Sequence, residues 1–208
     1  MKHKTEQEQF WAGKFGDDYI LRNKGDQILS SNVSLFRDII KNTKGVMSAI
    51  EFGANIGLNL KAIKQLRDDI ELSAIEINKK AVSGLSKLKN VKIYPQSIME
   101  FSPDYPRNLV FTKGVLIHIN PDILPRVYDL LYKTSNRYIC IIEYYNKTPV
   151  EVMYRGHKGK LFKRDFAGEI LDRYEDLVLA NYGFVYHRDN NFPQDDLTWF
   201  LLEKKGNP

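Results

Sequence analysis

One segment, Ala49–Leu60, constrains the fold of this chain more than any other. An apolar run ends in Glu51, a glycine-containing turn follows, and apolar residues then recur at helical spacing. Glycine at Gly53 and Gly57 lets the backbone turn sharply and lets a ligand approach it closely. The unpaired amides at the start of such a helix suit a carboxylate or a phosphate. The segment therefore predicts a strand, a tight turn and a helix beside a ligand site.

The spacing of this turn narrows the choice of ligand. The dinucleotide fingerprint has glycines at its first, third and sixth positions, whereas here Asn55 stands between Gly53 and Gly57. Asparagine also tolerates left-handed backbone. Glu76 ends the next apolar run, roughly 20 residues past the turn, where an acid can bond ribose hydroxyls. The alternative is that Glu51 and Glu76 are strand-end acids without a ligand.

Length and composition predict one soluble domain. The chain has 208 residues, no apolar run of the ~18 residues that a membrane span needs, and no apolar N-terminal segment typical of a secretory signal. The one cysteine, Cys140, lies in an apolar run and reads as a small buried strand residue. A cytoplasmic location without membrane partners is the simplest expectation, and no metal site is predicted.

A charge of +5, from 31 basic and 26 acidic residues, leaves two interpretations open. Such a balance suits an anionic substrate, or nucleic acid. The basic residues are spread out, with no run of five or more and no repeat of aromatic and basic residues. We therefore interpret most of them as solvated surface and do not expect nucleic acid as the partner.

Alternation of apolar runs and helical patterns predicts an α/β fold. We expect a Rossmann-like sheet of seven strands, mostly parallel with an antiparallel closing hairpin, and helices on both faces. The parallel strands are expected at Val46–Glu51, Glu71–Ile77, Val91–Tyr94, Leu109–Lys113 and Arg137–Tyr144, and the closing strands at Tyr182–His187 and Thr198–Glu203. The helices between them are expected at Gly57–Arg67, Asn78–Leu88 and Asp122–Thr134.

The single domain, 1–208, divides into four parts. Residues 1–45 form a helical preface, in which Thr5 with Glu8 suggests a capping box and Asp26 caps a helix over Gln27–Thr43. Residues 46–145 form the cofactor-binding core. Residues 146–180, rich in charge, form a substrate-side insertion with a helix over Arg164–Arg173, and residues 181–208 form the closing hairpin. The preface is a candidate lid, with Tyr19, Arg22 and Asn23 as its candidate contacts, and Trp11 is a candidate for the wall of the ligand site.

Ligands of parallel sheets bind outside the carboxyl ends of the strands, which brings several segments to one edge. The third strand is followed by Gln96, Ser97 and Ile98, and the fourth by Lys113, Gly114 and, further on, His118. His118 is a candidate general base with a pKa near working pH, although a structural role is equally compatible with the sequence.

The turn resembles motif I of the class I, Rossmann-like methyltransferases that use S-adenosylmethionine, with Asn55 in place of the middle glycine. In that family an acid after the third strand often meets the adenine amino group, and here Ser97 stands in that region instead. Gly114–Ile119 resembles the family's motif IV. The implied cofactor contacts are Glu51, Gly53, Ala54, Asn55, Gly57, Glu76, Ile77, Ser97, Ile98, Lys113 and Gly114, of which Lys113 and Gly114 would line the sulfonium and methyl group.

A narrower resemblance covers most of the chain. Residues 8–23, 143–174 and 182–204 resemble the methylases associated with pseudaminic acid biosynthesis. This implies methyl transfer to a hydroxyl or amino group of a small, anionic nonulosonic-acid-type sugar or its nucleotide-linked precursor. The candidate catalytic residues are His118, Tyr144 and His157, with Glu143 as a further possible base. The candidate substrate contacts are Tyr19, Tyr145, Arg155, Lys160 and Arg164.

Three other functions stay open from the sequence. The positive charge leaves a methyltransferase acting on RNA or another macromolecule, and the Rossmann-like pattern leaves a nucleotide-dependent dehydrogenase. A cofactor-binding accessory protein without turnover would keep Glu51, Gly53, Gly57 and Glu76 as well.

Overall fold

The computed structural model describes residues 5–206 and contains a central seven-stranded sheet in the order β3-β2-β1-β4-β5-β9-β8. Strands β1 to β5 are parallel, and β9 and β8 close the sheet in antiparallel register. The strands of this sheet are β1 (Ser48–Phe52), β2 (Glu71–Ile75), β3 (Val91–Tyr94), β4 (Arg107–Lys113), β5 (Ser135–Glu143), β8 (Leu177–Val185) and β9 (Leu197–Lys204).

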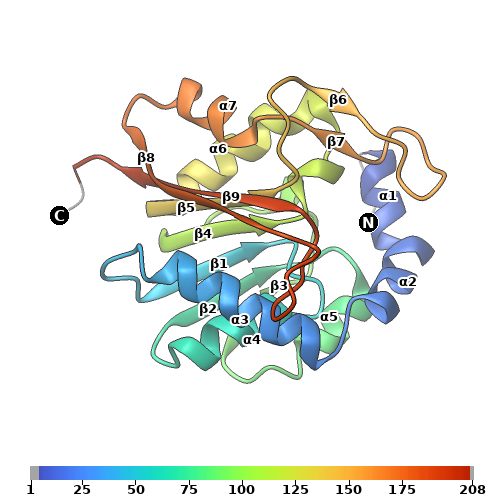
Figure 1. The fold of residues 1–208 in the computed structure, drawn as a ribbon, viewed down its shortest axis with the longest axis horizontal. Helices are drawn as coiled ribbons and strands as arrows, with labels where there is room; N and C mark the ends of the chain where they lie inside the picture. The colour runs from blue at the N-terminus through green and yellow to red at the C-terminus, as the bar shows by residue number, and fades with distance from the viewer. Residues whose placement is uncertain (1–4, 207–208) are drawn as a thin grey trace.

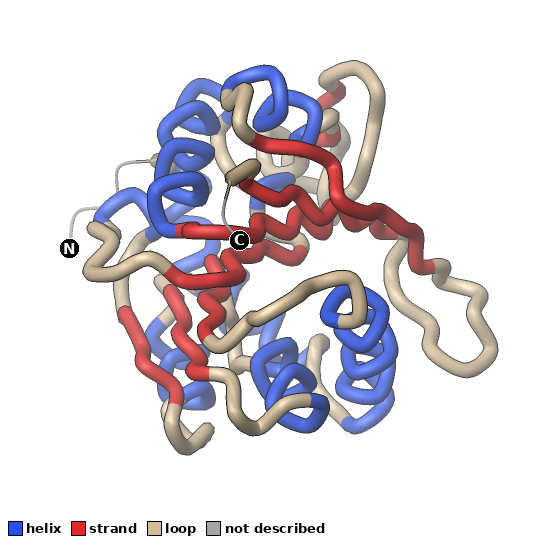
Figure 2. Tube along the Cα trace, turned by 90° about the vertical axis from the view of Figure 1, so that its left-hand side faces the viewer, coloured by secondary structure: helices blue, strands red, loops and turns tan. Residues whose placement is uncertain are grey.

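Helices cover both faces of the sheet (Figures 1 and 2). Helices α3, α4 and α5 lie on one face and α6 and α7 on the other. The helices are α1 (Glu6–Ala12), α2 (Lys14–Arg22), α3 (Asp26–Ile40), α4 (Leu58–Leu66), α5 (Lys79–Leu85), α6 (Leu124–Thr134) and α7 (Phe166–Arg173). The predicted fold class is confirmed.

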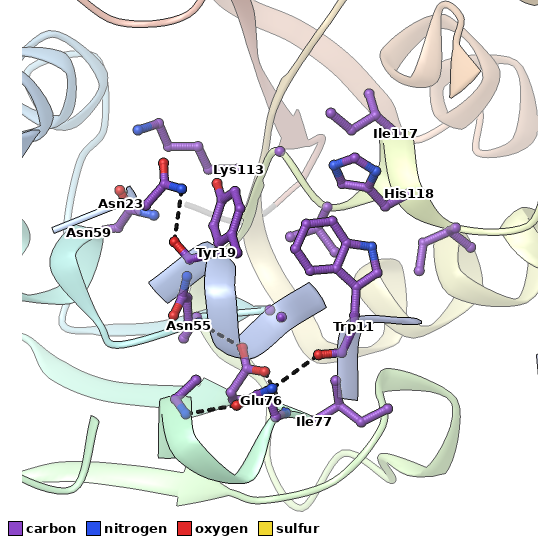
Figure 3. A pocket seen from close by; sticks show the side chains of 18 of the residues that line it. Trp11, Tyr19, Asn23, Asn55, Asn59, Glu76, Ile77, Lys113, Ile117 and His118 are labelled. Atoms are coloured by element: carbon purple, nitrogen blue, oxygen red, sulfur yellow. Dashed lines mark hydrogen bonds between the residues drawn. The ribbon is translucent and has the colours of Figure 1, made fainter. Parts of the chain in front are cut away.

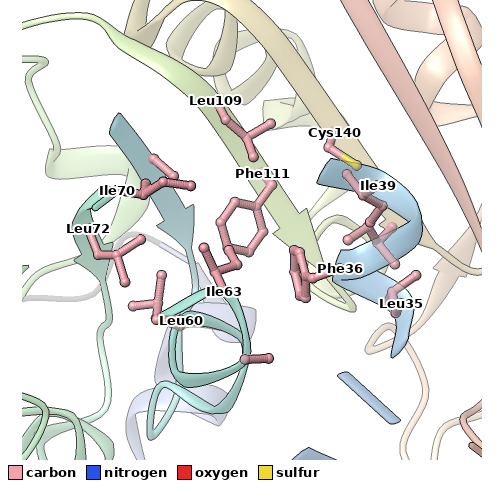
Figure 4. Packing of buried hydrophobic residues seen from close by; sticks show 14 of the residues in the cluster. Leu35, Phe36, Ile39, Leu60, Ile63, Ile70, Leu72, Leu109, Phe111 and Cys140 are labelled. Atoms are coloured by element: carbon pink, nitrogen blue, oxygen red, sulfur yellow. The ribbon is translucent and has the colours of Figure 1, made fainter. Parts of the chain in front are cut away.

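Each face has its own apolar core. On the first face, α3 and α4 pack on β1 and β4 through side chains such as Phe36, Ile63 and Phe111 (Figure 4). The rings of Phe36 and Phe111 meet edge to face, with centroids 5.1 Å apart. Cys140 is fully buried in this core, as its apolar neighbours in the sequence predict. These strands therefore hold the loops at their carboxyl ends in fixed positions.

The preface crosses the carboxyl edge of the parallel strands (Figure 1). Its predicted capping box is present: the Glu8 amide donates to the Thr5 hydroxyl, and the Thr5 amide donates to the Glu8 carboxylate. Residues 1–4 of the predicted preface and 207–208 of the predicted closing segment lie outside the described residues. The strand order reverses between β1 and β4. In doubly wound sheets, ligands bind in the crevice at the carboxyl ends of the two strands where the order reverses.

Several predicted boundaries differ from the structure. Helix α3 begins at Asp26 with Gly25 as its cap, so Asp26 lies in the first turn and not at the cap. Helix α7 begins after Asp165, whose carboxylate accepts the Gly168 amide at 2.8 Å. Strand β8 begins at Leu177, inside the predicted insertion, because that part of the strand pairs with the end of β9.

Two short strands were not predicted from the sequence. Strands β6 (Val150–Glu151) and β7 (Phe162–Lys163) form a separate antiparallel pair in the insertion, each too short to show a strand period. The insertion thus contains a small hairpin near α1 instead of a loop alone (Figure 1).

The helix after β4 also begins differently from the prediction. The predicted helix over Asp122–Thr134 is a 3₁₀ turn at Pro121–Ile123 followed by α6.

Candidate functional site

A cavity of about 660 Å³ lies at the carboxyl ends of the parallel strands. Its floor is formed by the residues that follow β1 to β4, and its roof by α1, α2, the start of α3 and the loop between β8 and β9. Figure 3 shows Glu76 and Asn55 on one side and His118 on the other, with Trp11 reaching between them. Segments from most of the chain meet in this one space.

The glycine turn brings backbone close to the cavity. Gly53 has φ of 79°, and a Cβ there would lie 2.6 Å from the Val115 side chain. Asn55 has φ of 48°, which confirms that asparagine adopts the left-handed conformation in place of the motif's middle glycine. The Asn55 amide donates to Glu76 at 2.7 Å, so the turn is tied to the end of β2.

Glu76 lies buried at the end of β2 and faces the cavity. Its carboxylate accepts the backbone amides of Asn55 and Asn78, both at 2.7 Å. Burial raises the pKa of Glu76, and these backbone hydrogen bonds act in the opposite direction. A carboxylate can accept about four hydrogen bonds, so Glu76 retains capacity for hydroxyl donors.

Glu51 does not line the cavity, contrary to the contact implied by motif I. It is almost fully buried and accepts a hydrogen bond from the Asn59 side chain at 2.5 Å. Burial raises its pKa to about 8, and the nearby Lys113 ammonium opposes that shift. Glu51 supports the cavity wall through Asn59, which itself lines the cavity.

Lys113 lines the cavity, but its ammonium points to α3, where it donates to the Asn32 side chain at 2.7 Å. Burial lowers the pKa of Lys113 to about 8, and the charges of Glu51 and Asp195 act against that shift. A cation here disfavours a sulfonium as its immediate neighbour and favours a carboxylate. The sequence had placed Lys113 beside the sulfonium and methyl group.

Gly57 also lies outside the cavity lining. It begins α4 with φ of 80°, and a Cβ there would lie 2.5 Å from the Leu85 side chain. Glycine at this position therefore serves the turn and the close approach of α4 to α5, rather than contact with a ligand.

Beyond Glu76, the cavity continues to the end of β3. Ser97, Ile98 and Ile77 line it there, as predicted. The Ser97 hydroxyl donates to the Glu8 carboxylate of α1 and accepts the Met99 amide at 3.0 Å. The sequence placed Glu8 only in a capping box, and no local signal connects it to β3.

His118 is buried on the opposite side of the cavity, between the rings of Trp11 and Tyr154, at centroid distances of 4.6 and 4.9 Å. Its Nδ1 lies 2.5 Å from the Lys160 carbonyl oxygen, which assigns the proton to Nδ1 and leaves Nε2 as an acceptor. Burial lowers the pKa of His118 to about 4, so the prediction of a pKa near working pH is wrong.

Glu143 positions the segment that contains His118. Its carboxylate accepts the amides of Val115 and Leu116, both at 3.0 Å. Burial raises the pKa of Glu143 to about 7. Because it is buried behind the cavity lining, Glu143 does not face a reacting group.

Tyrosines surround the remaining side of the cavity. Tyr19 and Tyr144, both predicted, line it together with Tyr154, which the sequence did not single out. Burial raises the pKa of Tyr19 and of Tyr144, so both hydroxyls stay protonated near neutral pH. Asp195 lies against the Tyr144 hydroxyl and raises its pKa further. These groups can donate hydrogen bonds to a polar ligand.

Besides Glu51 and Gly57, four predicted catalytic and substrate residues lie outside the cavity lining, and each has a different environment. The exposed His157 packs on the Phe10 ring, and Tyr145 on Phe200. Arg164 bonds Glu169 at 2.6 Å. Lys160 reaches Glu6 at 3.2 Å, so only its backbone carbonyl acts on the site, through His118. Of the predicted insertion contacts, Arg155 alone lines the cavity.

The roof is fastened by contacts between distant segments. The Asn78 side chain donates to the Trp11 carbonyl at 3.2 Å and to Asp17 at 3.0 Å. Gln7 donates to the Gly159 carbonyl at 2.9 Å, which joins α1 to the insertion. The three predicted lid residues, Tyr19, Arg22 and Asn23, all line the cavity, and so does Trp11.

The loop between β8 and β9 closes the other side of the roof. Gln194 donates to the Ser31 carbonyl of α3 at 2.8 Å, and Asp195 and His187 line the cavity. The sequence indicated only a polar loop here. Its contribution depends on the antiparallel closure of the sheet and on contacts that hold this loop against α3.

No family model matches the sequence, and no curated protein matches it. Solved structures, however, share the fold across nearly the whole chain. The plantazolicin methyltransferase BpumL, solved with S-adenosylhomocysteine, aligns with a TM-score of 0.65 at 15% identity, over 95% of this chain and 93% of that one. A Leishmania major S-adenosylmethionine-dependent methyltransferase aligns with a TM-score of 0.74 at 13% identity, over 95% and 81%.

Magnesium protoporphyrin IX methyltransferase from Synechocystis, also with S-adenosylhomocysteine, aligns with a TM-score of 0.68 at 15% identity, over 98% of this chain and all, 100%, of that one. The chain therefore has the Rossmann-like fold of the class I methyltransferases. Within residues 5–206, no helix is both long and apolar enough to cross a membrane.

Proposed function

We propose that this chain is an S-adenosylmethionine-dependent methyltransferase acting on a small molecule. The observation that carries the proposal is the arrangement of the turn after β1 and Glu76 after β2, which share one cavity and a 2.7 Å hydrogen bond. A buried acid with spare acceptor capacity at the end of β2 suits ribose hydroxyls. The fold shared with methyltransferases supports the same assignment.

The polar groups around the cavity fit this cofactor. Within the described residues, the Oδ1 atoms of Asn55 and Asn59 and the Nε1 of Trp11 are buried without a hydrogen-bond partner, and all three side chains line the cavity. Buried polar atoms normally find partners, so these groups suit a polar ligand. Lys113 and Asn32 would hold the carboxylate of the methionyl end, with Glu51 and Asn59 behind them.

The bound cofactor supplies a methyl group on a cationic sulfonium. The chain's own contribution is to position the acceptor and to exclude water, which α1, α2 and the β8–β9 loop do by roofing the cavity. His118 Nε2 would accept the proton of a hydroxyl acceptor, because Nδ1 is held by the Lys160 carbonyl. With a pKa of about 4, His118 is neutral at physiological pH, so its Nε2 lone pair is available to a hydroxyl donor.

The acceptor we propose is a hydroxyl or amino group of an anionic sugar of the nonulosonic acid type, free or nucleotide-linked. The sequence resemblance of residues 143–174 and 182–204 supports this class. The acceptor side of the cavity offers tyrosine hydroxyls and the Trp11 ring for a polyol, and the Arg22 and Arg155 guanidinium groups for its carboxylate. His157, Tyr145, Lys160 and Arg164 are not part of this proposal. A cytoplasmic location is part of the same proposal.

The test is methyl transfer to a panel of acceptors, read by mass spectrometry with S-adenosylmethionine as donor. The panel contains CMP-linked nonulosonic acids, their free sugars, neutral hexoses and a short RNA. We expect a one-methyl mass gain on a nonulosonic acid only. Methylation of the RNA would overturn the acceptor class. Binding of S-adenosylhomocysteine without transfer to any member would favour an accessory protein.

A further inference from the structure

We infer that Glu8 of α1 recognises the adenine amino group of the cofactor, in place of an acid after β3. The inference rests on the proposed function. It names the side chain by which the protein distinguishes adenine from other bases of the cofactor. It assigns a ligand contact to a helix of the roof, outside the strand–turn–helix core that contains the other cofactor residues.

The position of the base follows from the groups at the two ends of the cofactor site. Glu76 at β2 fixes the ribose, and Lys113 lies on the β4 side, where the methionyl end belongs. The base and the methionyl part leave the ribose in opposite directions. Because β3 lies on the other side of β2 from β1 and β4, the base must extend toward Ser97 and Ile98 at the end of β3.

This end of the cavity combines apolar side chains with a carboxylate. Ile77, Ile98 and Met99 line it, which suits the faces of a flat ring. Glu8 also lines it, and its carboxylate accepts the Ser97 hydroxyl proton. Ser97 itself is fixed because its oxygen accepts the Met99 amide at 3.0 Å. The Glu8 carboxylate is therefore held beside the predicted edge of the base.

The chemistry of Glu8 matches the adenine amino group. An ionised carboxylate only accepts hydrogen bonds, and the exocyclic amine of adenine only donates them. The capping box fixes the other oxygen, which accepts the Thr5 amide at 2.9 Å. The contacts with Thr5 and Ser97 hold both oxygens of the Glu8 carboxylate in position at this end of the cavity.

A consequence concerns the roof. Helix α1 is joined to the rest of the site through Asn78 and through the insertion, at Gly159. If Glu8 bonds the adenine, a bound cofactor adds a contact between α1 and the core. The cofactor then stabilises the helix that also presents Trp11 to the acceptor side.

The test compares two ligands by calorimetry: S-adenosylhomocysteine and S-inosylhomocysteine, in which an oxo group replaces the adenine amine. The wild type should bind the adenosyl ligand at least tenfold more tightly, because the oxo group faces the Glu8 carboxylate. Glu8→Gln should reduce this preference to less than threefold, since an amide can donate to the oxo group. Glutamine also satisfies the capping box, so α1 is retained.

Glu6→Gln is the matched control, because the Glu6 side chain lies on the same helix and is 85% exposed. It should keep the wild-type preference. An unchanged preference in Glu8→Gln, with normal binding of S-adenosylhomocysteine, would overturn the role of Glu8 and leave the proposed function intact. A wild type that binds neither ligand would instead contradict the proposed function itself.

Discussion

The two halves of the cavity are built differently. The cofactor half is formed by short loops directly after β1, β2 and β3, and its Glu76 carboxylate is held by backbone amides. The acceptor half is formed by α1, α2, the insertion and the β8–β9 loop, which are joined by side-chain bonds between distant segments. The cofactor half, called the floor below, thus depends on local backbone contacts. The acceptor half, called the roof, depends on contacts between segments far apart in the sequence.

This difference predicts which residues determine cofactor affinity and which determine turnover of the acceptor. Contacts of the floor depend on strand ends that two apolar cores hold in place, so a change there should act on cofactor affinity. Contacts of the roof depend on segments far apart in the sequence, and a change there should act on the acceptor and on turnover. Glu8 and Lys113 each connect the two halves, because Glu8 of α1 bonds Ser97 after β3 and Lys113 of β4 bonds Asn32 of α3. Variants of these two residues therefore test whether the two halves act separately.

The largest effect is expected at His118, on the acceptor side. His118→Ala removes the acceptor nitrogen and should lower kcat by about 10²- to 10⁴-fold, with little change in cofactor affinity. Because the pKa of His118 is about 4, the wild-type contribution should be full above pH 5 and fall only as the pH drops through 4. Steady-state rates on the sugar acceptor and titration with S-adenosylhomocysteine measure the two quantities.

His157→Ala is the control for this prediction, since His157 is exposed and lies outside the cavity lining. It should leave kcat within about twofold of wild type. An equal loss in both variants would show that the imidazole of His118 acts only through the stability of the roof.

The next effect concerns the floor. Glu76→Ala should weaken S-adenosylhomocysteine binding by about 1–3 kcal/mol, the cost of losing charge-assisted hydrogen bonds to a buried partner. Methylthioadenosine, which keeps the ribose and lacks the amino acid, should lose affinity to the same extent. Calorimetric titration of both ligands is the measurement, and unchanged affinities would remove Glu76 from the site.

Lys113→Met distinguishes binding of the methionyl end of the cofactor from binding of its ribose. It should weaken S-adenosylhomocysteine roughly tenfold, about 1.4 kcal/mol, and leave methylthioadenosine unchanged, because only the former has a carboxylate. Loss of affinity for both ligands would mean that Lys113 supports the fold of the cavity instead of binding the methionyl end.

The same residue predicts a pH dependence. Burial lowers the pKa of Lys113 to about 8 and raises that of Glu51 to about 8, so a rising pH removes the positive charge of Lys113 and adds the negative charge of Glu51. Affinity for S-adenosylhomocysteine should therefore fall as the pH rises through 8, and the loss should level off near the roughly tenfold loss expected for Lys113→Met. Methylthioadenosine titrated at the same pH values is the reference, and it should show a flat profile.

The smallest effect belongs to the helix cap. Thr5→Ala removes one half of the capping box and should destabilise α1 by about 1 kcal/mol, with amide exchange in residues 6–12 rising roughly fivefold. Exchange in α4, on the floor side, should not change. A uniform increase over both helices would mean that α1 does not open separately from the core.

The floor could be predicted from the sequence because its signals are local. A glycine turn after an apolar run and an acid after the next run identify β1, β2 and the cavity edge, and Asn55 adopts the left-handed conformation as expected. The same locality explains the errors at Glu51 and Gly57. A motif gives the position of a residue along the chain, but not whether its side chain faces a ligand or the neighbouring helix.

The roof could be predicted only in part. Aromatic residues of α1 and α2 suggested a lid, and Trp11 and Tyr19 do line the cavity. Glu8 and Asp195 had no such signal, because their partners, Ser97 and Tyr144, lie 89 and 51 residues away in the chain. The pKa of His118 also depends on burial under α1, which no local pattern specifies.

The most direct test of the account is a thermal-shift titration of the wild type and Glu76→Ala with S-adenosylhomocysteine and, separately, NADH. A ligand at about 100 times its dissociation constant adds roughly 2.7 kcal/mol of stability, which a melting curve resolves. We predict stabilisation of the wild type by S-adenosylhomocysteine alone, and a clearly smaller stabilisation of Glu76→Ala at the same ligand concentration. Stabilisation by NADH instead, or by neither ligand, would contradict the assignment of this cavity to S-adenosylmethionine.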